Sequence, residues 1–129
     1  FKAMPGYGLP DEDGVLLLRR FFHDLPTNDS LTKVLVDAWK NGDDETVGKL
    51  SYMDLFECMT QEDCPRERAL AQHTVKTMLV DRNVKMAETV EVLLKENRSA
   101  FVIVGGAHLV REEGVVSLLK KKGYKVERF

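Results

Sequence analysis

Apolar residues recur at helical spacing through much of the first half of the chain. A stripe with spacings of three and four predicts a helix that begins at Asp29 or Ser30 and closes at Asn41-Gly42. An apolar run before it predicts another helix over about residues 12–24, which Pro26 ends because proline disfavours helix in the preceding residue. Trp39 is expected to anchor the core of this helical layer.

The helical pattern continues in the middle of the chain. Asp43 and Asp44 can cap a short helix that runs through Leu50. From Pro65, which suits the first turn of a helix, apolar residues continue at helical spacing to Leu94. This pattern is compatible with one helix of roughly thirty residues or with two helices that break near Asp81.

The run Phe101-Val102-Ile103-Val104 differs because it is apolar without interruption. It predicts a short strand that is buried on both faces. Gly105 and Gly106 end the strand and form a tight turn, and His108 then follows at the carboxyl end of the strand, where ligands collect in open α/β sheets. With a helix over 112–122 and a final strand over 124–129, the sequence predicts a mostly helical α/β fold.

The predicted sheet is incomplete. Two or three strands are fewer than a stable sheet needs, yet the strand at 101–104 calls for a neighbour on each side. We therefore expect that the N-terminal half of a larger parent protein, or a second copy, completes the sheet. Residues 1–129 themselves are expected to form a single domain.

Composition excludes some functions. The 19 basic and 21 acidic residues give a net charge of −2, which disfavours nucleic acid as a partner because its binding needs a clustered basic face. No stretch approaches the about 20 apolar residues that span a bilayer, and there is no signal-peptide pattern. Since the chain starts at Phe1, these absences say nothing of the parent protein.

The two cysteines, Cys58 and Cys64, match no usual zinc or redox motif. They form a local disulfide if the protein is exported, or remain two free thiols, and the sequence leaves both alternatives open.

Three polar residues are the candidates for chemistry. His108 is a metal ligand or general acid–base, or else a hydrogen-bonded structural histidine. Arg82 and Asn83 interrupt an apolar helical pattern, so they form either an anion clamp with an orienting amide or part of a solvated face. Gly105 and Gly106 belong to neither a Walker loop nor a dinucleotide loop. A metal at His108 would need further ligands from elsewhere.

Several segments carry these residues in a specific order. They are Asp81-Arg82-Asn83-x-x-Met86-Ala87, the run from Phe101, Gly105-Gly106-Ala107-His108-Leu109-Val110 and Gly123-Tyr124, with Trp39-Lys40-Asn41-Gly42-Asp43 upstream. Together they resemble the C-terminal signature of the TraB/GumN (PrgY, TIKI-like) family, over roughly residues 31–129.

The resemblance implies an EreA/ChaN-like α/β fold and a metal-dependent hydrolytic site, peptidase-like in the animal members. It assigns Gly105 and His108 to the second of two Gly-x-x-His motifs, and Arg82 and Asn83 to the Arg-Asn motif. A divalent metal (Mn, Co or Zn), a peptide or small-molecule ligand, and an exported, periplasmic or membrane-associated parent are implied as well. The alternative is a non-catalytic module that binds or sequesters a peptide or small ligand.

Two departures from the family pattern bear on this interpretation. Arg111 stands where the family commonly has glycine, so the turn beside the site is expected to differ. The first Gly-x-x-His is absent, because neither His23 nor His73 has a glycine three residues before it. The chain therefore reads as the C-terminal half of a family member, with an incomplete site when alone.

Overall fold

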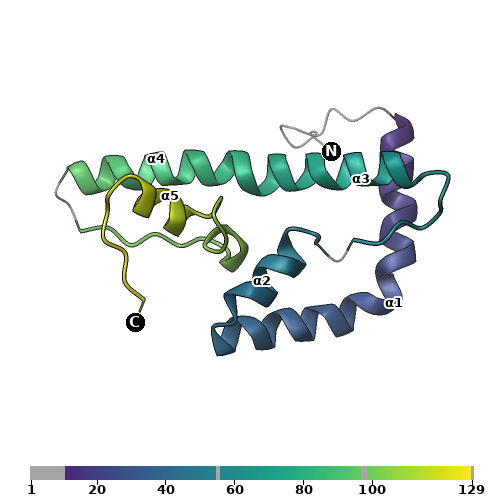
Figure 1. Ribbon diagram of the computed structural model, residues 1–129, viewed down its shortest axis with the longest axis horizontal. Coiled ribbons are helices and arrows are strands. Elements are labelled where there is room, and N and C mark those ends of the chain that lie inside the picture. The colour runs from purple at the N-terminus through teal and green to yellow at the C-terminus, as the bar shows by residue number, and fades with distance from the viewer. Residues whose placement is uncertain (1–10, 55, 97–98, 129) are drawn as a thin grey trace.

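The computed structural model describes residues 11–54, 56–96 and 99–128. Within these ranges the regular elements are all helices, and no residue is in a strand (Figure 1). The predicted α/β fold is therefore wrong for the described part of the chain, and so are the strands at 101–104 and 124–128. Phe129, the last residue of the second predicted strand, lies outside the described residues.

Helix α1 spans Asp11–Asn41 and contains Pro26. The sequence predicted two helices separated at this proline, whereas one continuous helix forms. Figure 1 shows that α1 changes direction part way along its length. A proline inside a helix favours such a bend, because its ring lacks the backbone N–H and crowds the preceding turn.

The predicted boundary between the helix that ends at Asn41 and the short helix that follows it is confirmed. Gly42 adopts a left-handed φ of +71°, and the amide of Asp43 donates to Ala38 O at 2.9 Å, which closes α1. Asp43 then caps α2, Asp44–Ser51, because its Oδ1 accepts from the amide of Thr46 at 3.0 Å.

A long helical rod follows (Figure 1). It consists of α3 (Cys64–Val75), the π-helical turn η1 (Lys76–Val80) and α4 (Asp81–Lys95). Pro65 lies in its first turn, as predicted. The rod is continuous rather than broken, but the widened turn lies directly before Asp81, where the sequence suggested a break. Widened turns of this kind are frequent beside functional residues.

The segment after the rod carries the turn η2 (Gly106–His108) and the helix α5 (Val115–Lys121). The side chains of Phe101 and Ile103 are 90% and 82% exposed, so the run predicted as a buried strand is not buried here. The apolar pattern indicates that a strand at 101–104 would need neighbouring strands on each side. The described residues contain no strand that could pair with it.

Two small apolar clusters hold these elements together. One joins α1, α2 and the segment after η2 through Ala38, Val47, Tyr52 and Val110. The other packs α5 on α4 through Ala87, Val115 and Leu119. Asn83 is 0% exposed and bonds both to Tyr52 of the first cluster and to the backbone leading into α5, so it lies where the two clusters meet.

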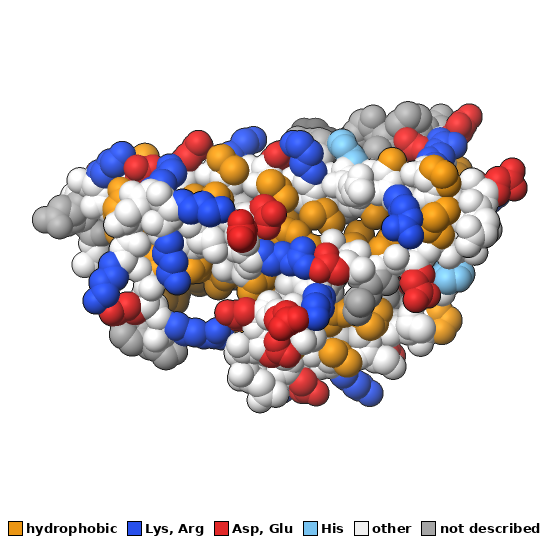
Figure 2. Space-filling view, in the orientation of Figure 1, with side chains coloured by type: hydrophobic (Ala, Val, Ile, Leu, Met, Phe, Trp, Pro, Cys, Tyr) orange, Lys and Arg blue, Asp and Glu red, His pale blue; other side chains and the backbone are white. Residues whose placement is uncertain are grey.

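Much apolar surface stays outside these clusters. Figure 2 shows hydrophobic side chains between the long rod and the α2 region, with charged side chains around them. Among the described residues, no helix is both long and apolar enough to cross a membrane.

Candidate functional site

The turn η2 presents His108 beside α4. The amide of His108 donates to Gly105 O at 2.9 Å, and that of Leu109 donates to Gly106 O at 3.0 Å, which produces a tight turn. A Cβ on Gly106 would lie 3.2 Å from Cδ1 of Trp39, so the indole would have to shift by a few tenths of an ångström to admit it. A Cβ on Gly105 would make only an ordinary contact, at 3.8 Å from Cδ2 of His108.

Asn83 fixes the imidazole of His108. Its Nδ2 donates to Glu113 O at 2.9 Å, and because a carbonyl can only accept, the amide nitrogen must face that side. Its Oδ1 therefore faces Nδ1 of His108, at 2.6 Å. Nδ1 must then carry the proton, and Nε2 of the neutral ring is left with a free lone pair.

The other contact of Asn83 reaches the opposite cluster. Nδ2 also donates to the hydroxyl of Tyr52, at 3.2 Å. A buried amide without partners would be costly, but both ends of this one are bonded, so its full burial is compatible with a stable fold. Burial, the largest cause, raises the pKa of Tyr52, and the bond from Asn83 opposes that rise.

The electrostatic surroundings favour the neutral form of His108. Burial is the main cause that lowers the pKa of the His108 imidazole, and the positive charge of Arg82 lowers it further. Arg82 is thus close enough to His108 to act on it, although its own side chain is exposed on α4. The structure brings His108 and Asn83 into contact and Arg82 into their vicinity.

A cavity of about 390 Å³ opens beside this histidine. It lies between the end of α1 and the η2 turn, and Trp39, Gly105, Gly106 and His108 are among its lining residues. Trp39 is 63% exposed, so the prediction that it anchors the core is wrong. Its ring lies against Gly106 instead, and it forms part of the cavity wall.

Arg111 is the residue that stands where the family pattern commonly has glycine. It has a φ of +67°, a left-handed conformation that glycine adopts without cost. Its guanidinium bonds to Asp54 and lies 4.8 Å from the ring centroid of Tyr52. The arginine therefore occupies a backbone conformation that glycine adopts more easily, and its side chain makes contacts that hold it there.

Sequence reasoning missed Tyr52 and Glu113 O as partners of Asn83. Tyr52 lies 31 residues before Asn83 and the contact of Glu113 is through its backbone, so no local pattern could show either. The only available signal was a buried-looking asparagine in an apolar helix, which requires partners without naming them.

The described residues do not form a complete metal centre. No group of three or more His, Cys, Asp or Glu side chains gathers anywhere among them. His108 offers one well-oriented nitrogen, with the hydrogen-bonded support that metal-binding histidines usually have. His108 could therefore serve as one ligand of a metal ion, and the described residues contain no cluster that would complete such a site.

Comparisons with known proteins confirm the family that the sequence resembles. The model of the TraB/PrgY/gumN family matches residues 1–128. A metalloprotease TIKI homolog from Amphimedon queenslandica is 33% identical over 72 residues, which cover 54% of this chain and 14% of the relative. The matched region is thus a small part of that relative's length. No solved structure matches the chain.

Proposed function

Because the chain belongs to the TraB/PrgY/gumN family, we propose that it supplies one side of a metal-dependent hydrolytic site that acts on peptides. The observation that carries the proposal is the bond between Nδ1 of His108 and Oδ1 of the buried Asn83, at 2.6 Å. This bond leaves Nε2 as the free nitrogen of a neutral imidazole, which is the form that binds a metal ion. The similarity to a metalloprotease TIKI homolog supports the same reaction class.

A divalent ion such as Mn²⁺, Co²⁺ or Zn²⁺ is the cofactor we propose for His108. When bound, it would supply the acidification of water that hydrolysis requires. Since three protein ligands are usual in catalytic sites, the others must come from outside the described residues. The first Gly-x-x-His that the family resemblance implies is the candidate, and we propose that the N-terminal half of the parent protein contributes it.

Each of the three polar residues has a distinct task in this proposal. Nε2 of His108 binds the ion. Asn83 is a positioning residue, because it is fully buried and acts only through the ring that it orients. The exposed guanidinium of Arg82 holds a substrate carboxylate or the negative charge that develops on the carbonyl oxygen.

The cavity beside His108 is the proposed place for the substrate. Its volume, about 390 Å³, suits a few residues of a peptide or a small molecule. The exposed indole of Trp39 offers an apolar surface for a side chain next to the histidine.

The test is hydrolysis of a peptide library by the parent protein, with and without each metal ion. We expect His108→Ala to abolish both tight metal binding, measured by calorimetry, and metal-dependent cleavage. His73→Ala is the matched control, because His73 is exposed on α3, and it should retain both. Full cleavage by His108→Ala would contradict the proposal, whereas saturable peptide binding that survives a chelator without cleavage would favour a non-catalytic binding module.

We also propose an oxidising compartment for the parent protein, in agreement with the exported location that the resemblance implies. Cys58 and Cys64 form a disulfide, the alternative that the sequence left open. Such bonds persist mainly outside the cytosol. Thiol labelling of the protein taken directly from its source organism tests this, since two labelled cysteines would contradict it.

A further inference from the structure

A second cavity, away from His108, contains a charged group that the proposed function does not use. It measures about 310 Å³ and lies where α1, α2 and α3 meet. Its walls are mainly aliphatic, since they include Leu16, Leu31, Leu50, Met53 and Leu70. Leu16 and Leu31 come from α1 on either side of Pro26, so the bent helix lines the cavity along much of its length.

Glu67 lies in the wall of this cavity. Its side chain is 2% exposed, an unusual environment for a carboxylate. Oε2 accepts from the amide of Met59 at 2.9 Å and lies 3.6 Å from Nη1 of Arg20. Oε1 is buried and has no hydrogen-bond partner among the described residues. A buried oxygen of this kind is costly, so it favours a ligand that can donate to it.

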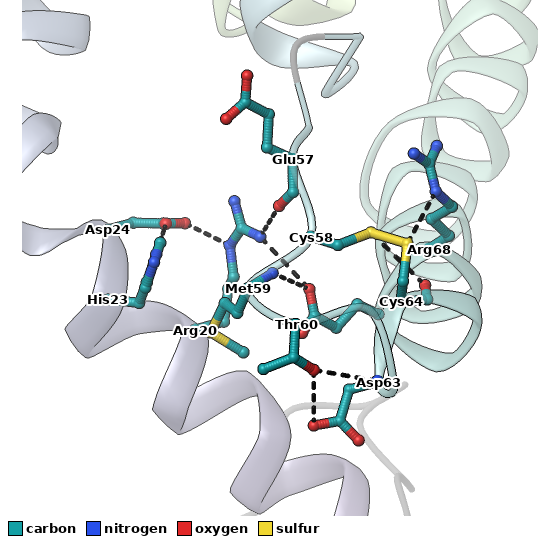
Figure 3. A network of polar contacts seen from close by, with 11 residues as sticks. Arg20, His23, Asp24, Glu57, Cys58, Met59, Thr60, Asp63, Cys64 and Arg68 are labelled. Atoms are coloured by element: carbon teal, nitrogen blue, oxygen red, sulfur yellow. Dashed lines mark hydrogen bonds and ion pairs between the residues drawn. A yellow bond between two sulfur atoms is a disulfide. The ribbon is translucent and has the colours of Figure 1, made fainter.

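The charges around the cavity indicate the sign of that ligand. Arg20 donates from Nε to Asp24 at 2.6 Å and also bonds to Glu57 O, as Figure 3 shows. Lys49, the other cation in the wall, is paired with Glu45 at 2.6 Å. The wall itself carries two cations, Arg20 and Lys49, and two carboxylates, Asp24 and Glu67. Each cation is paired more closely with a carboxylate other than Glu67, which keeps only the contact with Arg20 at 3.6 Å.

We propose that this cavity is a binding site for an aliphatic primary amine in its ammonium form. The ammonium group pairs with the carboxylate of Glu67, whose ion pair with Arg20 is long, at 3.6 Å, and the alkyl chain packs against the leucine side chains. A carboxylate of the same length is disfavoured, because it would bring two anions together. The wall thereby selects both an apolar body and a positively charged head.

The position of Glu67 is held from two sides. The Cys58–Cys64 disulfide closes the loop that carries Met59, and the amide of Met59 bonds to Glu67 (Figure 3 shows this loop). Arg20 lies over the ring of Phe56, with its Cζ 4.3 Å from the centroid, which keeps the guanidinium beside the carboxylate. These contacts keep the carboxylate of Glu67 in the wall of the cavity.

Calorimetric titration of the full chain with n-octylammonium, n-octanol and n-octanoate tests the proposal. We expect saturable binding of octylammonium, at least tenfold weaker binding of octanol, and no binding of octanoate. Equal affinity for all three probes would show only non-specific apolar uptake and would overturn the proposal, as would the absence of saturable octylammonium binding.

Two variants identify the site. In Glu67→Gln the amide oxygen can still accept from Met59 while an N–H₂ group replaces the free acceptor, so octylammonium should bind at least tenfold more weakly. Ala71→Leu fills the cavity from α3 without touching the charge, and should also weaken binding. Ala69→Leu, exposed on the same helix, is the matched control and should bind as the unmodified chain does. Unchanged binding by both Glu67→Gln and Ala71→Leu would overturn the assignment.

Discussion

Asn83 shows how one side chain can join a fold and a site. Its three bonds reach the hydroxyl of Tyr52, the carbonyl of Glu113 and the imidazole of His108. Because the carbonyl of Glu113 can only accept, it fixes the direction of the amide, and the bond to the imidazole then fixes the tautomer of the histidine. The same contacts that stabilise the junction of the two apolar clusters therefore determine which nitrogen faces outward.

Replacing Asn83 by alanine is therefore expected to lower the stability of the fold and to release the tautomer of His108. Asn83→Ala leaves buried polar groups unpaired, so the free energy of unfolding should fall by about 2–4 kcal/mol. The ring of His108 should lose its single tautomer, which nitrogen NMR of a histidine-labelled sample can measure. Asn41→Ala, at an exposed asparagine, should change neither quantity. A single tautomer retained in Asn83→Ala would contradict the positioning role.

Gly106 tests the contact between the turn and the tryptophan. An added Cβ would lie 3.2 Å from Trp39, so the exposed indole must shift by a few tenths of an ångström. Because Trp39 is the single tryptophan of the chain, its fluorescence reports this shift directly. We expect Gly106→Ala to change the emission of Trp39 with less than about 1 kcal/mol lost in stability. Gly105→Ala should leave the emission unchanged, and equal spectral changes in both variants would contradict the assigned contact.

At the scale of elements, close backbone approach determines where α5 begins. Gly114 precedes α5, and a Cβ there would lie 2.2 Å from the carbonyl oxygen of Val110. This atom belongs to the backbone of the turn after η2, so it cannot move aside as the end of a side chain can. Glycine is required at this position by space and not by an unusual φ, which is −73°.

Gly114→Ala should therefore destabilise the protein strongly. We expect a loss of at least about 2 kcal/mol in the free energy of unfolding, because backbone must be displaced. Gly14→Ala is the matched control, since Gly14 lies in α1 with nothing within 4 Å of the added Cβ. That variant should gain about 0.5–1 kcal/mol from the higher helix propensity of alanine. Chemical denaturation of both variants measures the contrast, and losses of equal size would contradict the steric account.

For the whole molecule, sequence patterns predicted structure correctly where it depends on neighbouring residues. They failed where the structure depends on residues far away in the sequence. The caps at Gly42 and Asp43 depend on neighbouring residues alone, and both were predicted correctly. Pro26 was expected to end a helix, but a bend accommodates it within α1. The run at 101–104 was expected to be buried in a sheet, yet a strand requires a partner that the described residues do not contain.

The candidate site likewise contains residues that the sequence could identify and residues that it could not. His108, Arg82 and the glycine turn could be selected from the sequence, because their residue types and spacing are unusual in an apolar context. Tyr52 could not, because its link to Asn83 joins α4 to the residue that follows α2. Contacts of this kind arise from packing between elements, which hydrophobic periodicity does not encode.

The acid stability of the whole fold offers the last prediction. Glu91 on α4 bonds to Lys122, beyond α5, and to Lys95 at 2.8 Å. These two cations lower the pKa of Glu91 from 4.5 to about 2. Between these values the unfolded chain binds the proton and the folded chain does not. The stabilising effect of Glu91 is therefore complete above about pH 5 and is lost as the pH falls toward 2.

Glu91→Gln should remove this pH dependence. The variant should be less stable than the unmodified chain at pH 7, and the difference should shrink steadily below pH 5, as measured by urea denaturation at a series of pH values. Added salt should also reduce the difference, because the pair is at the surface. Glu88→Gln, exposed on the same helix, is the control and should show neither trend. A difference between Glu91→Gln and the unmodified chain that stays constant from pH 7 to pH 2 would mean that the ion pairs do not hold the C-terminal segment to α4.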